Sequence, residues 1–173
     1  MPLFKKLNTY KLLSRSDIMK ATKTEREDNG DLIVRDLSQL ETDEVYKMGR
    51  DEPYFCGFWD KEVIEAIPNS EDCYALTARV GKELAGFAIT QYSPTLRKAT
   101  WENLYVSSEY RKRIYRGTSV SRILSEEMIK KMQSIGATSI NSLTETDNGP
   151  INNLLKNLGF EEVGNFVWTR KRL

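Results

Sequence analysis

The strongest candidate for an anion-binding site is the stretch YRGTSVSRIL, residues 115–124. Apolar residues from Val120 onward recur at helical spacing, which predicts a helix that begins near Ser119. The first N–H groups of a helix lack intrahelical partners and lie at its electropositive end. Such an end binds phosphate groups, and small residues such as Ser119 and Ser121 let them approach closely.

The loop before this helix carries four cationic side chains, which are Arg111, Lys112, Arg113 and Arg116. They would form a cationic rim beside the helix start. Arginine-rich loops are also commonly just solvated, and every exposed helix has an N-terminus. The loop and the helix start are therefore weak evidence by themselves. They predict a phosphate site only if the surrounding elements also indicate a protein that binds a phosphorylated ligand.

Composition limits the possible functions. The 173 residues are enough for one domain with a buried core, and 39% hydrophobic with 29% charged residues is typical of a globular protein. Lys plus Arg number 26 against 25 for Asp plus Glu, so no overall charge attracts nucleic acid, and nucleic-acid binding is the least favoured function. The absence of histidine excludes His-based catalytic triads and His-containing metal sites.

The two cysteines, Cys56 and Cys73, lack the spacing of a zinc or redox motif. No metal is expected, and both cysteines are interpreted as free thiols of a reducing compartment. No apolar run approaches the ~20 residues of a membrane span, and the N-terminus lacks the apolar core of a secretory signal. We therefore expect a cytoplasmic protein without a membrane partner.

The chain is expected to divide into two parts. Residues 1–30 are predicted to be a basic N-terminal arm, in which Lys and Arg alternate with apolar residues. The arm would pack on the domain or on a partner subunit, which would allow a homodimer. Residues 31–173 are predicted to form the folded domain.

The first half of the domain is predicted to contain a strand at residues 31–37 and a helix that Ser38 and Glu41 begin as a capping box. A loop dense in aromatic residues leads to a second short helix that stops at Pro68. Three strand candidates then form an antiparallel meander, over residues 73–80, 83–92 and 99–106.

The second half alternates helices with strands. The predicted order is a long helix from Ser119 to Gly136, a strand at residues 137–144, a short helix closed by Gly159, and a final strand or hairpin half at residues 161–173. The expected fold class is α/β in the mixed α+β sense: a single domain with a central mixed, mostly antiparallel sheet flanked by helices. Its parallel part would lie where strands alternate with helices.

Taken together, these elements resemble the GCN5-related N-acetyltransferase (GNAT) superfamily from about Leu32 to the C-terminus. The segments ELAGFAI and WENLYV look like the family's third and fourth strands, and YRGTSVSRIL looks like its acyl-CoA pyrophosphate loop. The most specific match is NGPINNLLKNLGF, in which Asn148 precedes a helix that ends in Leu-Gly-Phe at the family's spacing. The resemblance implies a GNAT-like acyltransferase domain.

The resemblance also implies acetyl-CoA, that is coenzyme A carrying an acetyl group, as co-substrate. The backbone of Leu104, Tyr105 and Val106 would hold the acyl carbonyl and the pantetheine arm. The pyrophosphate would lie on Arg116, Gly117, Thr118, Ser119, Val120 and Ser121. Asn148 would hydrogen-bond the pantetheine side of the co-substrate, although it can equally cap its own helix.

The chain departs from the family pattern in three places. Roughly residues 110–114 are extra, so a second register would put Arg111 in the pyrophosphate loop; we prefer Arg116 because it leaves small residues at their expected positions. The two serines of the loop replace glycines, and both are expected to take helical dihedrals that need no glycine. Leu155 stands where many members carry a tyrosine that protonates the departing thiolate, so this chain cannot use that acid.

Acyl transfer needs a neutral amine, and a carboxylate is the usual base that deprotonates it, directly or through water. Glu102 is the first candidate because some family members place a base there and its strand borders the thioester. Pairing of Glu102 with a neighbouring Lys or Arg is the alternative interpretation. Glu145 is the second candidate for the base, and Tyr105 or Tyr115 would serve as the acid.

The acceptor would lie against the loop between the first two helices, which in this family covers the acceptor side. Aromatic residues of this loop would form a wall suited to an apolar or aromatic acceptor, or to a cation over rings: Tyr54, Phe55, Phe58 and Trp59. Packing in the core is the alternative, and for at least two of the four it is the better interpretation.

The predicted function is that of an acyl-CoA-dependent N-acetyltransferase, which transfers an acetyl group from acetyl-CoA to a primary amine of a small molecule or peptide. A peptide N-terminus, a lysine, a polyamine and an antibiotic amine all remain open as acceptors. The alternative is a non-catalytic CoA-binding or protein-interaction module with the same fold. That alternative is motivated by the two serines of the loop and by Leu155.

Overall fold

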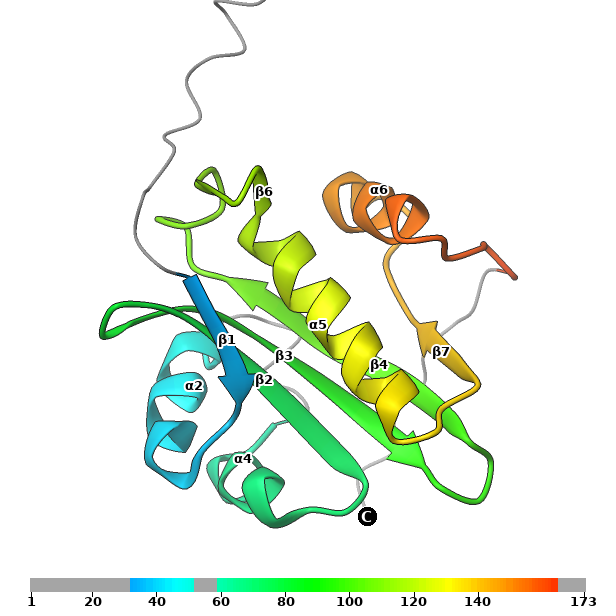
Figure 1. Cartoon of the computed structure of the whole chain (residues 1–173), viewed down its shortest axis with the longest axis horizontal. Helices are drawn as coiled ribbons and strands as arrows, with labels where there is room; N and C mark the ends of the chain where they lie inside the picture. The colour runs from blue at the N-terminus through cyan, green and yellow to red at the C-terminus, as the bar shows by residue number, and fades with distance from the viewer. Residues whose placement is uncertain (1–31, 52–58, 165–173) are drawn as a thin grey trace, which may run out of the picture.

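The computed structural model describes residues 32–51 and 59–164, which form a five-stranded sheet with helices on both faces (Figure 1). The strands lie in the order β1-β2-β3-β4-β7, with bounds β1 Leu32–Asp36, β2 Cys73–Val80, β3 Glu83–Ser93, β4 Lys98–Val106 and β7 Ser139–Ser142. Strands β1 to β4 pair antiparallel, and β4 pairs parallel with β7. The predicted mixed, mostly antiparallel sheet is confirmed.

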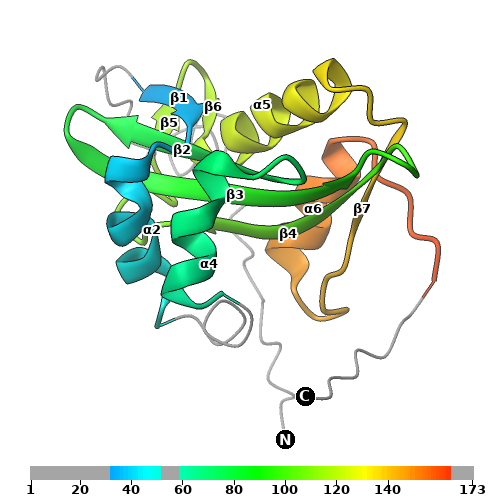
Figure 2. The same cartoon turned by 90° about the horizontal axis from the view of Figure 1, so that it is seen from below.

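One face of the sheet is covered by α2 (Thr42–Gly49) and α4 (Lys61–Ala66), as Figure 2 shows. The predicted capping box is present in the short 3₁₀ helix η1 (Gln39–Glu41), where the Ser38 backbone N–H donates to the Glu41 carboxylate at 3.2 Å. A second 3₁₀ helix, η2 (Ile67–Asn69), follows α4 and contains the predicted breaker Pro68. Buried residues under this layer include Val45, Trp59, Ile64, Phe87 and Ile89.

The opposite face is covered by α5 (Val120–Ser134), which lies across the sheet. Its fully buried residues Leu124, Met128 and Met132 pack on small residues of the strands, so the helix lies close to the sheet. Gly86 of β3 leaves room first for the backbone of β4 and then for this helix, because a Cβ there would lie 2.5 Å from the backbone oxygen of Tyr105 and 3.3 Å from the Leu124 side chain. The first turns of α5 therefore stand over the C-terminal end of β4.

A small hairpin that was not predicted lies between β4 and α5. It pairs β5 (Ile114–Tyr115) with β6 (Thr118–Ser119). Arg116 (φ 51°) and Gly117 (φ 79°) form its two-residue turn, and positive φ at both residues is typical of a type I′ turn. Of the extra residues 110–114 only Ile114 belongs to this hairpin, and residues 110–112 lie in the turn that precedes it.

The expectation of helical dihedrals at both serines is wrong for one of them. Ser119 is extended, with φ −77° and ψ 156°, and it is the N-cap of α5, whereas Ser121 lies inside the helix. An N-cap residue takes extended dihedrals because it precedes the first helical residue. The negative φ still explains why a serine replaces glycine there without strain.

The chain after β7 forms α6 (Gly149–Asn157), and residues 161–164 contain no strand. The rest of the predicted final strand and the N-terminal arm lie outside the described residues. Within the described residues, no helix is both long enough and apolar enough to cross a membrane.

Candidate active site

The centre of the candidate site is the edge of β4 that follows a β-bulge. Asn103 pairs with Ile89 and Trp101 pairs with Thr90, so Glu102 is the extra residue between them. On its other side β4 pairs with β7 only from Lys98 to Trp101. From the bulge to Val106 no described strand covers this side of β4, and Figure 1 shows β7 lying beside only the first part of the strand. We call this part of β4 the free edge.

The free edge exposes backbone hydrogen-bonding groups. The N–H of Ser107 donates to the oxygen of Ala85 at 2.9 Å, which makes these two residues a hydrogen-bonded pair of the β3–β4 ladder. Antiparallel pairs alternate, so the N–H and C=O groups of Leu104 and Val106 point away from β3. The Val106 oxygen accepts from Arg111 Nε, and the other groups are suited to bind the amides of an extended ligand arm.

The N-terminus of α5 lies beyond the C-terminal end of β4. The Ser119 hydroxyl accepts from the N–H of Arg122 at 3.3 Å and lies 3.0 Å from the Ser121 hydroxyl. This cap satisfies only one of the leading amides, and those of Val120 and Ser121 point out of the helix. The helix start therefore has the amides and small side chains that an anionic group needs.

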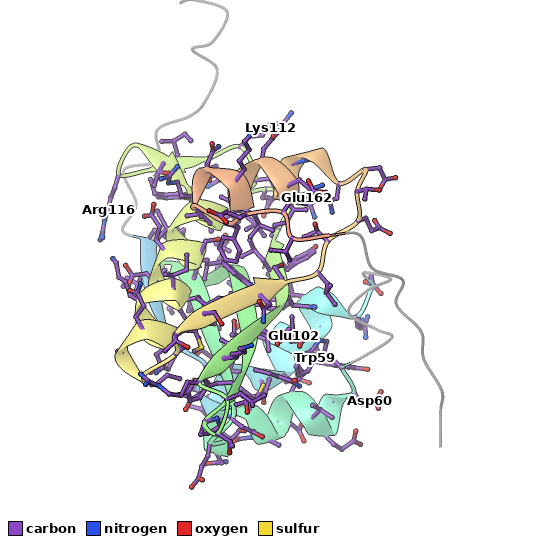
Figure 3. The ribbon with its side chains drawn as sticks, turned by 90° about the vertical axis from the view of Figure 1, so that its right-hand side faces the viewer. Trp59, Asp60, Glu102, Lys112, Arg116 and Glu162 are labelled. Atoms are coloured by element: carbon purple, nitrogen blue, oxygen red, sulfur yellow. The ribbon has the colours of Figure 1, made fainter. Side chains whose placement is uncertain are left out.

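Of the cationic side chains, Arg111 lies against the free edge. Its Nε donates to the Val106 oxygen at 2.8 Å, and its guanidinium carbon lies 5.5 Å from the centre of the Tyr105 ring. Arg116 is exposed at the hairpin turn, and Figure 3 shows Arg116 and Lys112 at one end of the molecule, well separated from Glu102. The structure thus brings Arg111, but not Arg116, into contact with β4.

Glu102 is half-buried, and burial raises the pKa of its carboxyl group. The pKa of Cys73 is raised to about 12, mainly by burial and then by the negative charges of Asp72 and Glu102. Glu102 therefore lies near that free thiol. Among the described residues no Lys or Arg forms a salt bridge with Glu102. The alternative of a paired strand carboxylate finds no support, and a desolvated, unpaired carboxylate is suited to accept a proton.

The two tyrosines predicted as acids occupy different environments. Tyr105 is half-buried and stacks on Phe87, with ring centres 5.6 Å apart. Tyr115 is only 2% exposed and belongs to the core beneath α5. Leu155 is also buried in that core, which fits its apolar side chain. Tyr105 is therefore the better placed of the two acids.

The aromatic wall is described only in part. Tyr54, Phe55 and Phe58 lie outside the described residues. Trp59 is 5% exposed and packs in the core beside α4, as the packing alternative states. Figure 3 shows Trp59 and Glu102 at the same level of the molecule.

Two asparagines, Asn148 and Asn152, make the side-chain hydrogen bonds at the junction of the β7–α6 loop with α6. Asn148 caps α6 by accepting from the N–H of Ile151 at 3.5 Å. Asn152 was missed by the sequence reasoning: it accepts from the Thr144 hydroxyl at 2.6 Å and donates to the Glu145 oxygen at 2.9 Å. Its position four residues after Asn148 was the available signal, because that spacing places both side chains on one face of the helix.

No group of three or more His, Cys, Asp or Glu side chains within residues 32–51 and 59–164 could hold a metal ion.

Comparison with known proteins decides the family. The sequence profile of the Acetyltransferase (GNAT) family matches residues 34–160. The chain belongs to the GNAT acetyltransferase family. No curated protein matches the sequence at a significant level.

Many solved structures share the GNAT fold of this chain. AAC(6')-Iy in complex with the bisubstrate analogue CoA-S-monomethyl-acetylneamine is 19% identical, with a TM-score of 0.66, over 83% of this chain and 99% of that chain. The ribosomal-protein-S18-alanine N-acetyltransferase from Escherichia coli is 22% identical, with a TM-score of 0.64, over 78% and 80%. The PaiA N-acetyltransferase from Thermoplasma acidophilum, in complex with coenzyme A, is 19% identical, with a TM-score of 0.61, over 76% and 90%. At these identities the likeness establishes the fold.

Proposed function

We propose that this GNAT protein is an acetyl-CoA-dependent N-acetyltransferase that acts on a primary amine of a small molecule or peptide. The observation that carries the proposal is the free edge of β4, which begins at Glu102 and ends beneath the start of α5. Within the part of the chain that the structure describes, the Glu102 carboxylate forms no salt bridge. A thioester substrate with an extended amide arm and a pyrophosphate needs these features in this order.

The chain's own groups fit coenzyme A along this path. The backbone of Leu104, Tyr105 and Val106 would hold the acyl carbonyl and the pantetheine arm. The N-terminal turn of α5, with Ser119 and Ser121, would hold the pyrophosphate together with an arginine of the preceding loop. Membership of the family and the solved complexes of its relatives with coenzyme A support this assignment.

Glu102 would take a proton from the incoming ammonium, directly or through one water, so that the amine nitrogen has a lone pair. The nitrogen then attacks the thioester carbonyl carbon, the C–N bond forms and the C–S bond breaks. After the attack the nitrogen is positively charged and loses its second proton as the amide forms. The thiolate of coenzyme A leaves and takes a proton, for which Tyr105 is the candidate donor, and the proton lost by the nitrogen restores the Tyr105 hydroxyl, directly or through water. Burial supports the role of Glu102, because a raised pKa makes a carboxylate a better base.

The acceptor is proposed to be an amine, and the relatives act on amines of more than one chemical class. One relative is an aminoglycoside N-acetyltransferase and another is a ribosomal-protein-alanine N-acetyltransferase. The test is the release of free thiol from acetyl-CoA in the presence of peptide N-termini, lysine peptides, polyamines and aminoglycosides, with calorimetry of CoA binding alongside. We expect binding, and thiol release with at least one amine class.

Two negative outcomes of this test differ in meaning. Binding of CoA without thiol release for any amine would favour the non-catalytic CoA-binding module. No heat of binding with CoA or acetyl-CoA at millimolar ligand would overturn the proposal as a whole.

A further inference from the structure

The turn after β4 is anchored by a buried tyrosine. Tyr110 is 2% exposed, and its hydroxyl donates to the carboxylate of Glu83 at the start of β3. Burial, followed by the hydrogen bond to Glu83, raises the pKa of Tyr110 to about 12, so its hydroxyl remains a donor at neutral pH. The guanidinium carbon of Arg113 lies 4.6 Å from the centre of the Tyr110 ring. The Tyr110 ring is thus held at its hydroxyl by Glu83 and on one face by Arg113.

The backbone of the same turn is tied to β3 as well. The Ser107 oxygen accepts from the N–H groups of Tyr110 at 2.9 Å and Arg111 at 3.1 Å. The Ser107 N–H donates to Ala85, two residues after Glu83. Consecutive contacts therefore fix residues 107–111 against the first residues of β3.

This anchor determines where the next residue points. The Tyr110 side chain enters the core beneath α5, whereas Arg111 reaches the Tyr105 ring, which packs with the core on the α2–α4 face. The turn therefore contacts both faces of the sheet at its end. It is followed by the β5–β6 hairpin and the start of α5. Loss of the anchor would let the turn rotate, and both Arg111 and the helix approach would shift relative to the free edge.

We infer that Tyr110 and Glu83 are positioning residues for the co-substrate: their hydrogen bond holds the turn that places Arg111 on the free edge and leads to the start of α5. Neither side chain takes part in the chemistry. The inference rests on the proposed function, because it concerns the site that would bind acetyl-CoA.

The test compares CoA affinity, by calorimetry, in the full-length protein, in four single variants that include one control, and in one double variant. Tyr110→Phe and Glu83→Ala each remove the hydrogen bond, and both should weaken CoA binding about five- to tenfold, the effect of one net hydrogen bond. Glu83→Gln keeps an oxygen acceptor for the hydroxyl and should stay close to the wild-type affinity. In the double variant Tyr110→Phe/Glu83→Ala the two losses should not add, since both remove one interaction.

The matched control is Tyr92→Phe. Tyr92 is also a buried tyrosine beneath α5, and its hydroxyl donates to the oxygen of Ile135 at the far end of that helix, at 3.3 Å. It should lose stability as Tyr110→Phe does but keep its CoA affinity. If an amine substrate is found, Tyr110→Phe and Glu83→Ala should raise KM for acetyl-CoA and leave kcat nearly unchanged, and Glu83→Gln should leave both nearly unchanged.

Two results would overturn the inference and can be told apart. If wild-type protein binds CoA and Tyr110→Phe binds it equally well, or if Tyr92→Phe weakens binding as much, the pair has only a structural role. If wild-type protein binds no CoA, the proposed function fails and the inference fails with it.

Discussion

Glu102 is the residue at which the chemistry is most directly testable. Its pKa is raised from the usual value of 4.5 because burial disfavours the charged carboxylate. A base must be ionised, so kcat/KM should fall as the pH drops through this raised pKa. Glu102→Gln should lower kcat about 10²- to 10⁴-fold and remove this acidic limb, with CoA affinity nearly unchanged. Stopped assays across pH, with calorimetry for CoA, measure both effects.

The same pKa shift sets the sign of the stability effect. A raised folded-state pKa means that the protonated form stabilises the fold at low pH, and that this contribution is lost as the pH rises through the folded pKa. At neutral pH the charged carboxylate of Glu102 is therefore unfavourable, and Glu102→Gln should unfold at no lower urea concentration than wild type.

Glu145→Gln is the matched control for activity. If it abolishes turnover while Glu102→Gln leaves the pH profile unaltered, Glu145 is the base.

The loop arginines can be separated by single substitutions. Arg116→Ala should weaken CoA binding by about 1.5 kcal/mol, the low end for hydrogen bonds to charged groups, because Arg116 is exposed. The control is Arg97→Ala: Arg97 is also exposed and has a similar positive φ, 53° against 51°, but its Nε donates to Gly136 at the far end of α5. Unchanged affinity in Arg116→Ala, with loss in Arg111→Ala, would establish the second register.

At the scale of elements, the start of α5 has separable structural and binding roles. Ser119→Ala should cost about 1 kcal/mol of unfolding free energy because the cap is lost, whereas Ser119→Gly should cost only a few tenths. Ser121→Gly should cost about 0.5–1 kcal/mol, since Ser121 is helical. The double glycine variant should gain little CoA affinity, because a helix presents its leading amides whatever its side chains.

Urea unfolding and calorimetry with CoA test this prediction together. Valine at either position should bind CoA less well than serine, because its branched Cβ would crowd the pyrophosphate. A double glycine variant that binds CoA orders of magnitude tighter and becomes active on amines would mark the serines as a degraded site. The non-catalytic alternative would then describe the natural protein better.

At the scale of the whole molecule, co-substrate binding should stabilise the fold by mass action. CoA at a hundred times its Kd should add about 2.7 kcal/mol to the unfolding free energy. For a chain of this size that corresponds to a rise in Tm of roughly 5–10 °C. Differential scanning fluorimetry measures it, and Glu102→Gln should show the same rise. An equal rise with inorganic pyrophosphate would contradict a site that extends along β4.

Local sequence patterns predicted most of the helices and strands and their order, but not the β5–β6 hairpin. The apolar periodicity from Val120 predicted α5, the Ser38–Glu41 spacing predicted the start of the first helix, and Asn148 predicted the cap of α6. The spacing from Asn148 to Phe160 pointed to the family that the profile then established. Each of these signals lies within a few turns of chain, where side-chain type and backbone geometry are directly linked.

The assembly of the site depends on strand register and on contacts between distant parts of the chain. The bulge at Glu102 depends on the register between β3 and β4, and the free edge depends on where β7 stops pairing. The absence of a salt-bridge partner for Glu102 among the described residues, and the bond between Glu83 and Tyr110, depend on residues far apart in the chain. Ser119 took extended dihedrals because it caps a helix that starts one residue later than expected. Strand register and contacts between distant residues arise from packing of the whole core, which no local pattern encodes.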